Sequence, residues 1–399
     1  MTEPTSEEIE FREYARRWLD ENKPRDVPFR LALSPIEITS REQKDYLQAW
    51  QRRCYEARLV GPSYPREYGG WGMTAACQRI AQQELARARA PFLLNLVALN
   101  MAAPTIFLHG DEEQKRRFIP GCLSADEIWC QGFSEPGAGS DLANVQTFCE
   151  RRGDVWIANG HKLWTSLGQF AKWMILLART SKDDKYRGLT YFICPVEGAA
   201  GVTVRPLVKI TGEAGFNEVL LEGVTIPDGL RLDRVGNGWT VAMTTLLHER
   251  GAAEGAGGGA RAPQLIGQLI AHAKRMFRDG DCAADDPVTR DQLMKLAIRA
   301  HGIELHARRA GVPALCDHPL RLPLQSKVLA SELDQDVARL GTDLAGALGE
   351  LAALDPRAPE HGHWPLAYMN SYGFTIAAGT SEIQRNILGE RVLGLEKSK

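Results

Sequence analysis

The sequence predicts an α+β fold in which an N-terminal helical domain, a middle antiparallel β domain and a C-terminal helical bundle follow one another. Residues 1–125 carry apolar side chains at the spacing of amphipathic helices. Residues 126–235 instead contain short β-branched and aromatic runs, too closely spaced for helical crossovers between strands. The helical period returns after Gly236 and continues to the end. We therefore expect three domains, at 1–125, 126–235 and 236–399.

Each domain divides into elements. Thr5 and Glu8 match a capping box that opens a helix at 5–22. Further helices are expected at 41–57, 75–90, 93–110 and 112–122. Strands are expected at 129–132, 145–151, 155–159, 173–178, 189–194, 203–207 and 219–224. In the last domain we expect loops at 279–287 and 354–365, and a capping box formed by Ser381 and Gln384 at the final helix.

Length and composition limit the class of protein. A chain of 399 residues is too long for one ordinary core. The formal net charge is −2 without a long basic run, so nucleic acid is not expected as a partner. The eight cysteines include no C-x-x-C pair, which predicts no metal site and favours a reducing compartment. No apolar run reaches the ~20 residues that span a bilayer, and the acidic N-terminus lacks a signal peptide's apolar core. We expect a soluble cytoplasmic protein without a membrane partner.

A glycine-rich loop, Ser134-Glu-Pro-Gly-Ala-Gly-Ser-Asp141, follows the first strand. Its proline and two glycines exclude a helix and allow the backbone to approach a ligand closely. Ser134 and Ser140 add hydroxyl groups, so the loop can offer donors to a flat or anionic ligand. A plain surface loop accounts for these residues equally well.

Two more segments have the composition of a cofactor site. Trp164, followed by two hydroxyl residues, can cover a flat cofactor while Ser166 hydrogen-bonds its edge. A core tryptophan is the more frequent use of such a residue. Near the C-terminus, Gly379 supplies a turn before a helix whose free N–H groups suit a phosphate or a polar ring edge. A well-capped helix without a ligand is the alternative.

Glu249 is the candidate for acid–base chemistry. If 239–253 form one helix, its face otherwise carries small or apolar residues: Ala242, Thr245, Leu246, Ala252 and Ala253. Desolvation on such a face would raise the pKa of the carboxyl and improve it as a proton acceptor. A structural ion pair with Arg250 or Arg261 is the commoner alternative. The glycine-rich run 251–259 favours close approach of a ligand or a helix, with a plain helix end as the alternative.

Together these segments resemble the acyl-CoA dehydrogenase family over nearly the whole chain. The loop Ser134–Asp141 is similar to the family's flavin and substrate loop, Asn159–Ser166 to its second flavin strand, and Gly379–Arg385 to its C-terminal flavin motif. The resemblance implies an acyl-CoA dehydrogenase-like fold, FAD as cofactor and an acyl-CoA thioester as substrate. It further implies α,β-dehydrogenation, electrons passed to an electron-transfer flavoprotein, a role in fatty acid or lipid catabolism, and a homotetramer or homodimer.

The resemblance also implies which residue is the base that takes the α-proton while the β-hydrogen leaves as hydride to flavin N5. Many members carry this base just before the C-terminal Gly-Thr pair, where this chain has Ala378, which cannot serve. Isovaleryl- and long-chain-type members carry a glutamate on the helix after the β domain, and Glu249 matches that position. The small Ala378 leaves room for a branched or bulky acyl group. Its N–H can still bind the thioester carbonyl.

The remaining site residues follow from the same resemblance. It implies flavin contacts at Gln131, Ser134, Trp164, Ser166, Thr380 and Glu382, and substrate contacts at Ser140, Arg250 and Ala378. Gln131 and Ser134 replace a tyrosine and a threonine of other members. The family's later flavin-contact arginine and its Gly-Gly-x-Gly stretch have no clear counterpart in 274–290 or 340–360. Two alternatives stay open: a flavin monooxygenase or oxidase on the same fold, which needs no α-proton base, and a non-catalytic partner subunit of a heteromeric acyl-CoA dehydrogenase.

Overall fold

A computed structural model describes residues 4–27, 29, 31, 37–255, 258–278, 280–309, 312–351 and 355–397, with the side chains of all these residues except 250–255, 258–261, 278 and 313. The chain forms two compact units, Glu3–Glu249 and Arg250–Lys399. The division falls inside the helix α6 (Gly238–Gly255). The boundaries that we expect at 125/126 and 235/236 stay a prediction.

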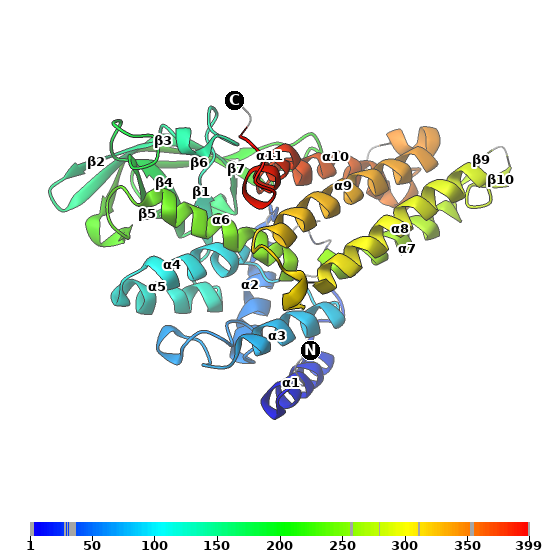
Figure 1. The fold of residues 1–399 in the computed structure, drawn as a ribbon, viewed down its shortest axis with the longest axis horizontal. Coiled ribbons are helices and arrows are strands. Elements are labelled where there is room, and N and C mark those ends of the chain that lie inside the picture. The colour runs from blue at the N-terminus through cyan, green and yellow to red at the C-terminus, as the bar shows by residue number, and fades with distance from the viewer. Residues whose placement is uncertain are drawn as a thin grey trace. The chain divides into compact units, whose positions relative to one another are not determined.

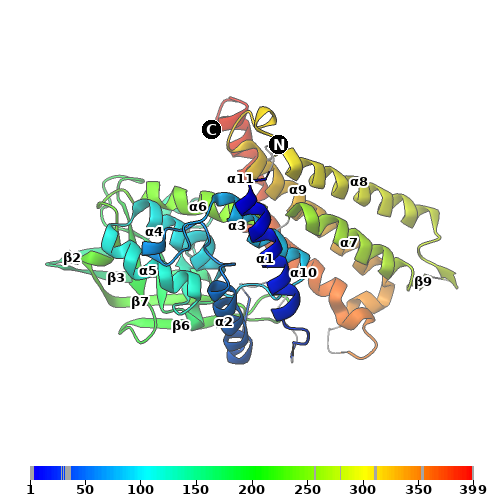
Figure 2. The same ribbon diagram turned by 90° about the horizontal axis from the view of Figure 1, so that it is seen from below.

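Helices form the N-terminal part of the first unit. They are α1 (Ser6–Asn22), α2 (Arg41–Glu56), α3 (Ala75–Arg87), α4 (Ala103–His109) and α5 (Glu112–Ser124), with a π-helical turn at Ala98–Ala102. The predicted capping box is confirmed, because the Thr5 side chain accepts from the Glu8 N–H and the Glu8 carboxylate accepts from the Thr5 N–H. The buried face of α1 packs against α3 (Figure 2).

A β-sheet follows. Its strands are β1 (Trp129–Gly132), β2 (Phe148–Arg152), β3 (Val155–Ser166), β4 (Trp173–Arg179), β5 (Leu189–Pro195), β6 (Val202–Leu207), β7 (Phe216–Pro227) and β8 (Arg231–Leu232). They pair in the order β6-β7-β3-β2-β4-β5-β8, and β1 also pairs with β4. The expected all-antiparallel pairing is wrong at two places, because β1 and β2 run parallel to β4. The β2–β3 hairpin lies between β1 and β4 along the chain, and it replaces the helix that usually connects parallel strands.

The central strands β4 and β5 are buried on both faces. Alternate residues therefore enter two different cores. Ile175, Leu177 and Tyr191 pack with the helices, whereas Met174 and Phe192 pack on the opposite face of the sheet. The first half of α6 lies on the helical side, with α4 and α5 beyond it (Figure 1). This arrangement places α6 against β5.

The second unit is helical. It contains α7 (Gly258–Ala273), α8 (Pro287–Arg309), α9 (Arg321–Leu344), α10 (His363–Ile376) and α11 (Ser381–Ile387), with a hairpin of β9 (Phe277–Arg278) and β10 (Asp281–Cys282). Helices α7, α8 and α9 run side by side in both ribbon views (Figures 1 and 2). Gly341 on α9 lets the Trp364 ring approach, because a Cβ there would lie 2.1 Å from Trp364 Cε3.

Both loops expected in this unit are shorter than predicted. The segment 279–287 contains the strand β10, which pairs with β9. The second loop ends at Gly362, because α10 begins at His363. Pro365 therefore lies in the first turn of a helix, where its missing N–H breaks no intrahelical hydrogen bond.

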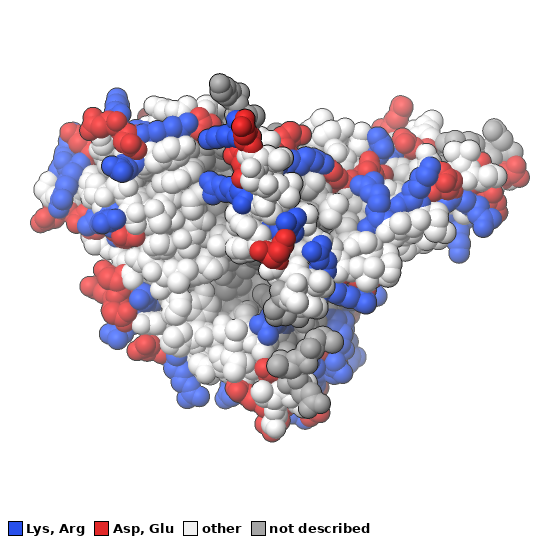
Figure 3. Space-filling view, in the orientation of Figure 1, with Lys and Arg blue, Asp and Glu red and all other residues white. Residues whose placement is uncertain are grey.

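Charged side chains of both signs are interspersed over the face drawn in Figure 3. Many of them form surface ion pairs, such as Arg299 with Asp336 on α8 and α9. Within the described part of the chain, none of the helices has the length and apolar character that crossing a membrane requires.

Candidate active site

A buried lysine holds the glycine-rich loop. Lys162, on β3, donates from Nζ to Glu135 Oε1 at 2.7 Å. It also donates to the carbonyl oxygens of Phe133 at 3.1 Å and Leu177 at 2.8 Å. The Lys162 side chain is 0% exposed and that of Glu135 is 6% exposed. All three ammonium hydrogens therefore have acceptors, which is the condition under which a buried ion pair is tolerated.

Glu135 is equally well satisfied. Its carboxylate accepts from the backbone N–H groups of Gln146 at 2.6 Å and Thr147 at 2.9 Å. Burial acts to raise the pKa of Glu135, but the Lys162 ammonium and the N–H donors outweigh burial and lower the pKa below its ordinary value. We did not predict this pair. The strand period contains the signal, because Trp156, Ala158 and Lys162 share the buried face of β3, and a buried lysine requires an acid.

Several predicted flavin contacts lie at the ends of β1 and β3. The Leu163 N–H donates to the Ser134 carbonyl at 2.8 Å and so joins the two segments. Gln131 and Ser134 are half-buried, and Ser166 is buried. Ser140, predicted to contact CoA, is exposed farther along the loop.

Trp164 is not a core residue. Lys162 pairs with Val219 and Thr165 with Asn217, so β3 has one extra residue opposite β7 and forms a β-bulge. Trp164 lies in this bulge with a left-handed φ of 58°, and its side chain is 54% exposed. Its ring meets Phe216 edge-on at 5.8 Å between centroids. The interpretation as a core tryptophan is therefore wrong, and the bulge turns the indole ring toward the surface of its unit.

Helix α6 places Glu249 on the face that its spacing predicts. Ala242 and Thr245 on that face are fully buried, Leu246 is partly buried, and Glu249 itself is half-buried. The pKa of the Tyr191 hydroxyl is raised by burial, and the Glu249 carboxylate adds to the increase. Glu249 is therefore partly removed from bulk water. The side chains of Arg250 and Arg261 lie outside the described residues. Of the glycine-rich run 251–259, the structure describes only backbone, at the end of α6 and the start of α7, so the predicted close approach stays a prediction.

The C-terminal motif lies in the second unit. Ala378 has a left-handed φ of 54°, and Gly379, with φ 88°, continues the predicted turn. Thr380 is the N-cap of α11, since its side chain accepts from the Ile383 N–H at 3.2 Å. The capping box predicted from Ser381 and Gln384 is therefore wrong. Gln384 instead donates from Nε2 to the Ala378 carbonyl at 2.7 Å, which holds the turn.

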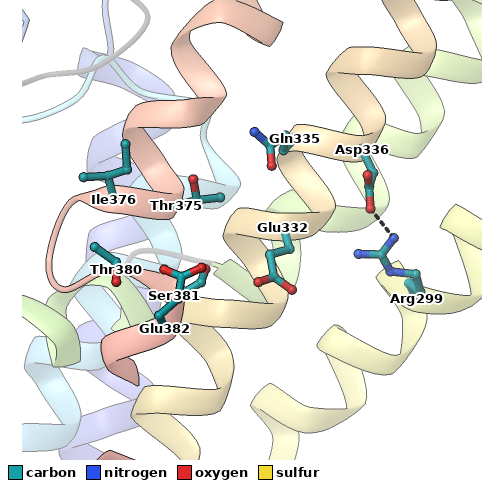
Figure 4. Close-up of a pocket in the computed structure, with 9 residues that line it drawn as sticks. All are labelled: Arg299, Glu332, Gln335, Asp336, Thr375, Ile376, Thr380, Ser381 and Glu382. Carbon is teal, nitrogen blue, oxygen red and sulfur yellow. Dashed lines mark hydrogen bonds and ion pairs between the residues drawn. The ribbon is translucent and has the colours of Figure 1, made fainter. Parts of the chain in front are cut away.

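Thr380 and Glu382 line a pocket of about 410 Å³ in the second unit (Figure 4). Its wall is formed by α8, α9, the end of α10 and the start of α11 through Arg299, Glu332, Gln335, Asp336, Thr375, Ile376, Thr380, Ser381 and Glu382. The carboxylates of Glu332 and Glu382 point into the space between α9 and α11 (Figure 4). The buried Ser381 Oγ has no hydrogen-bond partner among the described residues.

Comparison with known protein families agrees with this architecture along the chain. Sequence profiles described as acyl-CoA dehydrogenase N-terminal, middle and C-terminal domains match residues 5–126, 130–224 and 236–393. The chain belongs to the acyl-CoA dehydrogenase family. It has the family's fold, with an N-terminal helical domain, a middle β-sheet domain and a C-terminal helical domain. It is an acyl-CoA dehydrogenase, an FAD-dependent oxidoreductase.

The similarity to individual members of the acyl-CoA dehydrogenase family extends over 97% or more of this chain. The chain is 36% identical to the acyl-CoA dehydrogenase IpdE1 of Mycobacterium tuberculosis, over 97% of this chain and 98% of that protein. Among solved structures it is similar to the Tcur3481-Tcur3483 steroid ACAD, with 26% identity and a TM-score of 0.81 over 99% of both chains. It is also similar to the ChsE4-ChsE5 complex from Mycobacterium tuberculosis, with 27% identity and a TM-score of 0.76 over 100% of both chains.

The residues present fit the flavin that this family uses. A Cβ at Gly137 or Gly139 would meet no atom within 4 Å, so the space beside the loop is open. The exposed ring of Trp164 and the hydroxyl of Ser166 provide an aromatic face and a hydrogen-bonding group, as a flat polar ring requires. In the second unit, the unpaired Ser381 Oγ adds a polar group at the pocket.

Proposed function

We propose that this chain catalyses α,β-dehydrogenation of an acyl-CoA thioester with Glu249 as the base. The carboxylate takes the proton from the carbon next to the thioester carbonyl and becomes a carboxylic acid. FAD, when bound, accepts the β-hydrogen as a hydride at flavin N5. The observation that supports this role is the position of Glu249, a half-buried residue on a face of α6 whose other described residues are small or apolar.

The binding residues are part of the same proposal. Flavin is held by Gln131, Ser134, Trp164, Ser166, Thr380 and Glu382, CoA is contacted by Ser140 and Arg250, and the N–H of Ala378 binds the thioester carbonyl. The left-handed turn at Ala378 supports the last assignment, because strained backbone is frequent where a peptide N–H is aimed at a ligand.

The substrate is proposed to be a branched or bulky acyl-CoA from lipid catabolism, with an electron-transfer flavoprotein as the acceptor. Alanine at 378 removes side-chain volume where many relatives carry the base. Similarity to the Tcur3481-Tcur3483 steroid ACAD supports a bulky acyl group. All eight cysteines are free thiols, which supports a reducing, cytoplasmic location.

The chain is proposed to work as an oligomer. Helix α8 exposes the large apolar side chains of Met294, Ile298 and Leu305 at 61%, 65% and 47%, whereas Leu293 and Leu296 face its own core. Such an exposed apolar row is typical of a surface that another chain covers. A homotetramer or homodimer is the family expectation, and the two solved complexes named above make a heteromer an equal candidate. Light scattering of the chain expressed alone would distinguish these states by mass.

Glu249→Gln tests the proposed base. We expect the variant to bind FAD and acyl-CoA normally but to lose nearly all turnover, because an amide cannot take the α-proton. Glu222→Gln, an exposed glutamate on β7, is the control and should keep full activity. The substrate for this assay is first selected by flavin bleaching with butanoyl-, 3-methylbutanoyl-, octanoyl- and steroid-acyl-CoA. Wild-type turnover in Glu249→Gln would show that Glu249 is not the base.

The second candidate lies within the same enzyme class: this chain is the non-catalytic partner subunit of a heteromeric acyl-CoA dehydrogenase. The missing counterparts of the later flavin arginine and of the Gly-Gly-x-Gly stretch favour it. Flavin stoichiometry of the purified chain decides between the two functions. A yellow, active homomer supports the catalytic role, whereas a colourless chain that becomes active only with a second protein supports the partner role.

A further inference from the structure

We propose that Tyr191 and Thr245 are positioning residues that hold the Glu249-bearing turn of α6 in a fixed place relative to the glycine-rich loop. This inference rests on the proposed role of Glu249 as the base. Both residues belong to the first unit and lie on neighbouring elements, β5 and α6.

The contact between the strand and the helix is a chain of buried hydroxyl groups. Tyr191 Oη lies 2.9 Å from Thr245 Oγ1, which lies 2.9 Å from Thr105 Oγ1 on α4. Thr245 donates its hydroxyl proton to the Val241 carbonyl at 3.1 Å. Its oxygen is therefore left to accept from the other two hydroxyls. Tyr191, Thr245 and Thr105 are all 0% exposed.

The ring of Tyr191 contacts the residue directly before the glycine-rich loop. Its ring meets the ring of Phe133 edge-on, with 5.8 Å between centroids and 89° between planes. Phe133 directly precedes Ser134, and its carbonyl accepts from Lys162. Tyr191 thus touches α6 through its hydroxyl and the residue that leads into the loop through its ring, so one rigid side chain sets the separation of α6 from the start of the loop.

A second contact fixes the start of α6 on the same strand. A Cβ at Gly238 would lie 2.5 Å from the backbone nitrogen of Thr190, and the Gly236 N–H donates to Thr190 Oγ1 at 3.1 Å. Gly238 and Thr245 are about two helical turns apart. Anchored at both points, α6 can neither slide nor rotate without leaving buried hydroxyls unpaired, and Glu249 lies one turn beyond the second anchor.

The test removes single hydroxyls. Tyr191→Phe keeps the ring, Thr245→Val keeps the shape, and Thr245→Ser restores the hydroxyl. The matched controls are Tyr186→Phe and Thr225→Val. The exposed ring of Tyr186 also contacts α6, through Trp239, and Thr225 lies on the exposed face of β7. Two properties of the purified flavoprotein are measured: amide hydrogen exchange of segments 132–141 and 242–249, and steady-state kinetics with the acyl-CoA selected above.

We expect Tyr191→Phe and Thr245→Val to exchange about tenfold faster in both segments, with α1 unchanged. We expect kcat to fall roughly 10- to 100-fold with KM nearly constant, because the base is displaced while substrate contacts remain. Thr245→Ser should recover most of the lost kcat, because it restores the hydroxyl. If Tyr191→Phe does not fold, Thr245→Val alone tests the proposal.

Wild-type exchange in both segments of Tyr191→Phe and Thr245→Val would overturn the proposal, as would faster exchange spread evenly over the whole chain. The exchange result does not depend on turnover. Full activity in Glu249→Gln would therefore contradict the role of Glu249 as the base. Unchanged hydrogen exchange in the Tyr191 and Thr245 variants would contradict the positioning role of these two residues.

Discussion

Lys162 Nζ lies 2.7 Å from Glu135 Oε1 at a site where both side chains are buried, and this pair joins two motifs that contain three of the six proposed flavin contacts. Glu135 belongs to the loop Ser134–Asp141, and Lys162 belongs to the segment that ends in Trp164 and Ser166. Because each partner is also held by backbone groups, the pair fixes the loop against β3 and β4.

Removing one partner of this pair should be costly. Lys162→Met leaves the Glu135 carboxylate buried without its cation, and we expect the free energy of unfolding to fall by about 3–5 kcal/mol. Lys185→Met is the control, because the Lys185–Asp141 pair is exposed and screened by water, so its loss should change the stability far less. Chemical denaturation measures both. Adding Glu135→Gln to Lys162→Met should recover part of the loss, and equal losses in the two lysine variants would contradict a special role for the buried pair.

Replacing Trp164 should weaken flavin binding without changing the stability of the fold. The side chain is 54% exposed, so Trp164→Ala should change the unfolding free energy of the flavin-free protein by less than about 0.5 kcal/mol. The bound flavin per chain should nevertheless decrease, because an aromatic surface is lost. Trp156→Ala, which removes a buried indole that donates to Asp228, should instead cost about 3–5 kcal/mol. Normal flavin content in Trp164→Ala would remove this residue from the flavin site.

Asp228 should give the fold a measurable acid dependence. Hydrogen bonds from Arg231 and Trp156 lower the pKa of its carboxyl to about 2. A folded-state pKa below the unfolded value of ~3.9 stabilises the protein fully above pH ~4, and the stabilisation is lost as the pH falls toward 2. We expect Asp228→Asn to lose about 1–2 kcal/mol near neutral pH, with an allowance for partial exposure, and much less near pH 2. Thermal unfolding followed from pH 7 to pH 2 measures this, and a pH-independent difference would contradict the assignment.

The two hydroxyls at the start of α11 should differ in their effect on stability. Thr380→Ala removes the N-cap and should cost about 1 kcal/mol, whereas Thr380→Ser should keep the cap. Ser381→Ala should be nearly neutral, since the buried Ser381 Oγ has no partner among the described residues. Denaturation of the flavin-free protein compares the three variants. A larger loss in Ser381→Ala than in Thr380→Ala would restore the capping box that the sequence predicts.

Local features were predictable because their causes are local. The capping box at Thr5 depends on residues within one turn. The start of β3 at Val155 also agrees with the expected strand 155–159, but the expected end is wrong, because pairing with β7 continues β3 to Ser166. The face of α6 that carries Glu249 follows from the helical period alone, and the structure agrees with the burial that this period predicts for Ala242 and Thr245. The register of β3 also contained the signal for Lys162, because a two-residue period puts its side chain on the buried face.

The sequence by itself determined the order of helices and strands, the glycine-rich loop, the turn at Gly379 and the candidate residues, because these depend on period and turn chemistry within a few residues. Only the tertiary structure decided that β1 runs parallel to β4, that a β-bulge turns Trp164 outward, that Lys162 meets Glu135, and that Tyr191 reaches both α6 and the residue that leads into the loop. Each of these depends on which distant segments come together, and the free energy of burying and pairing side chains across those segments selects the outcome.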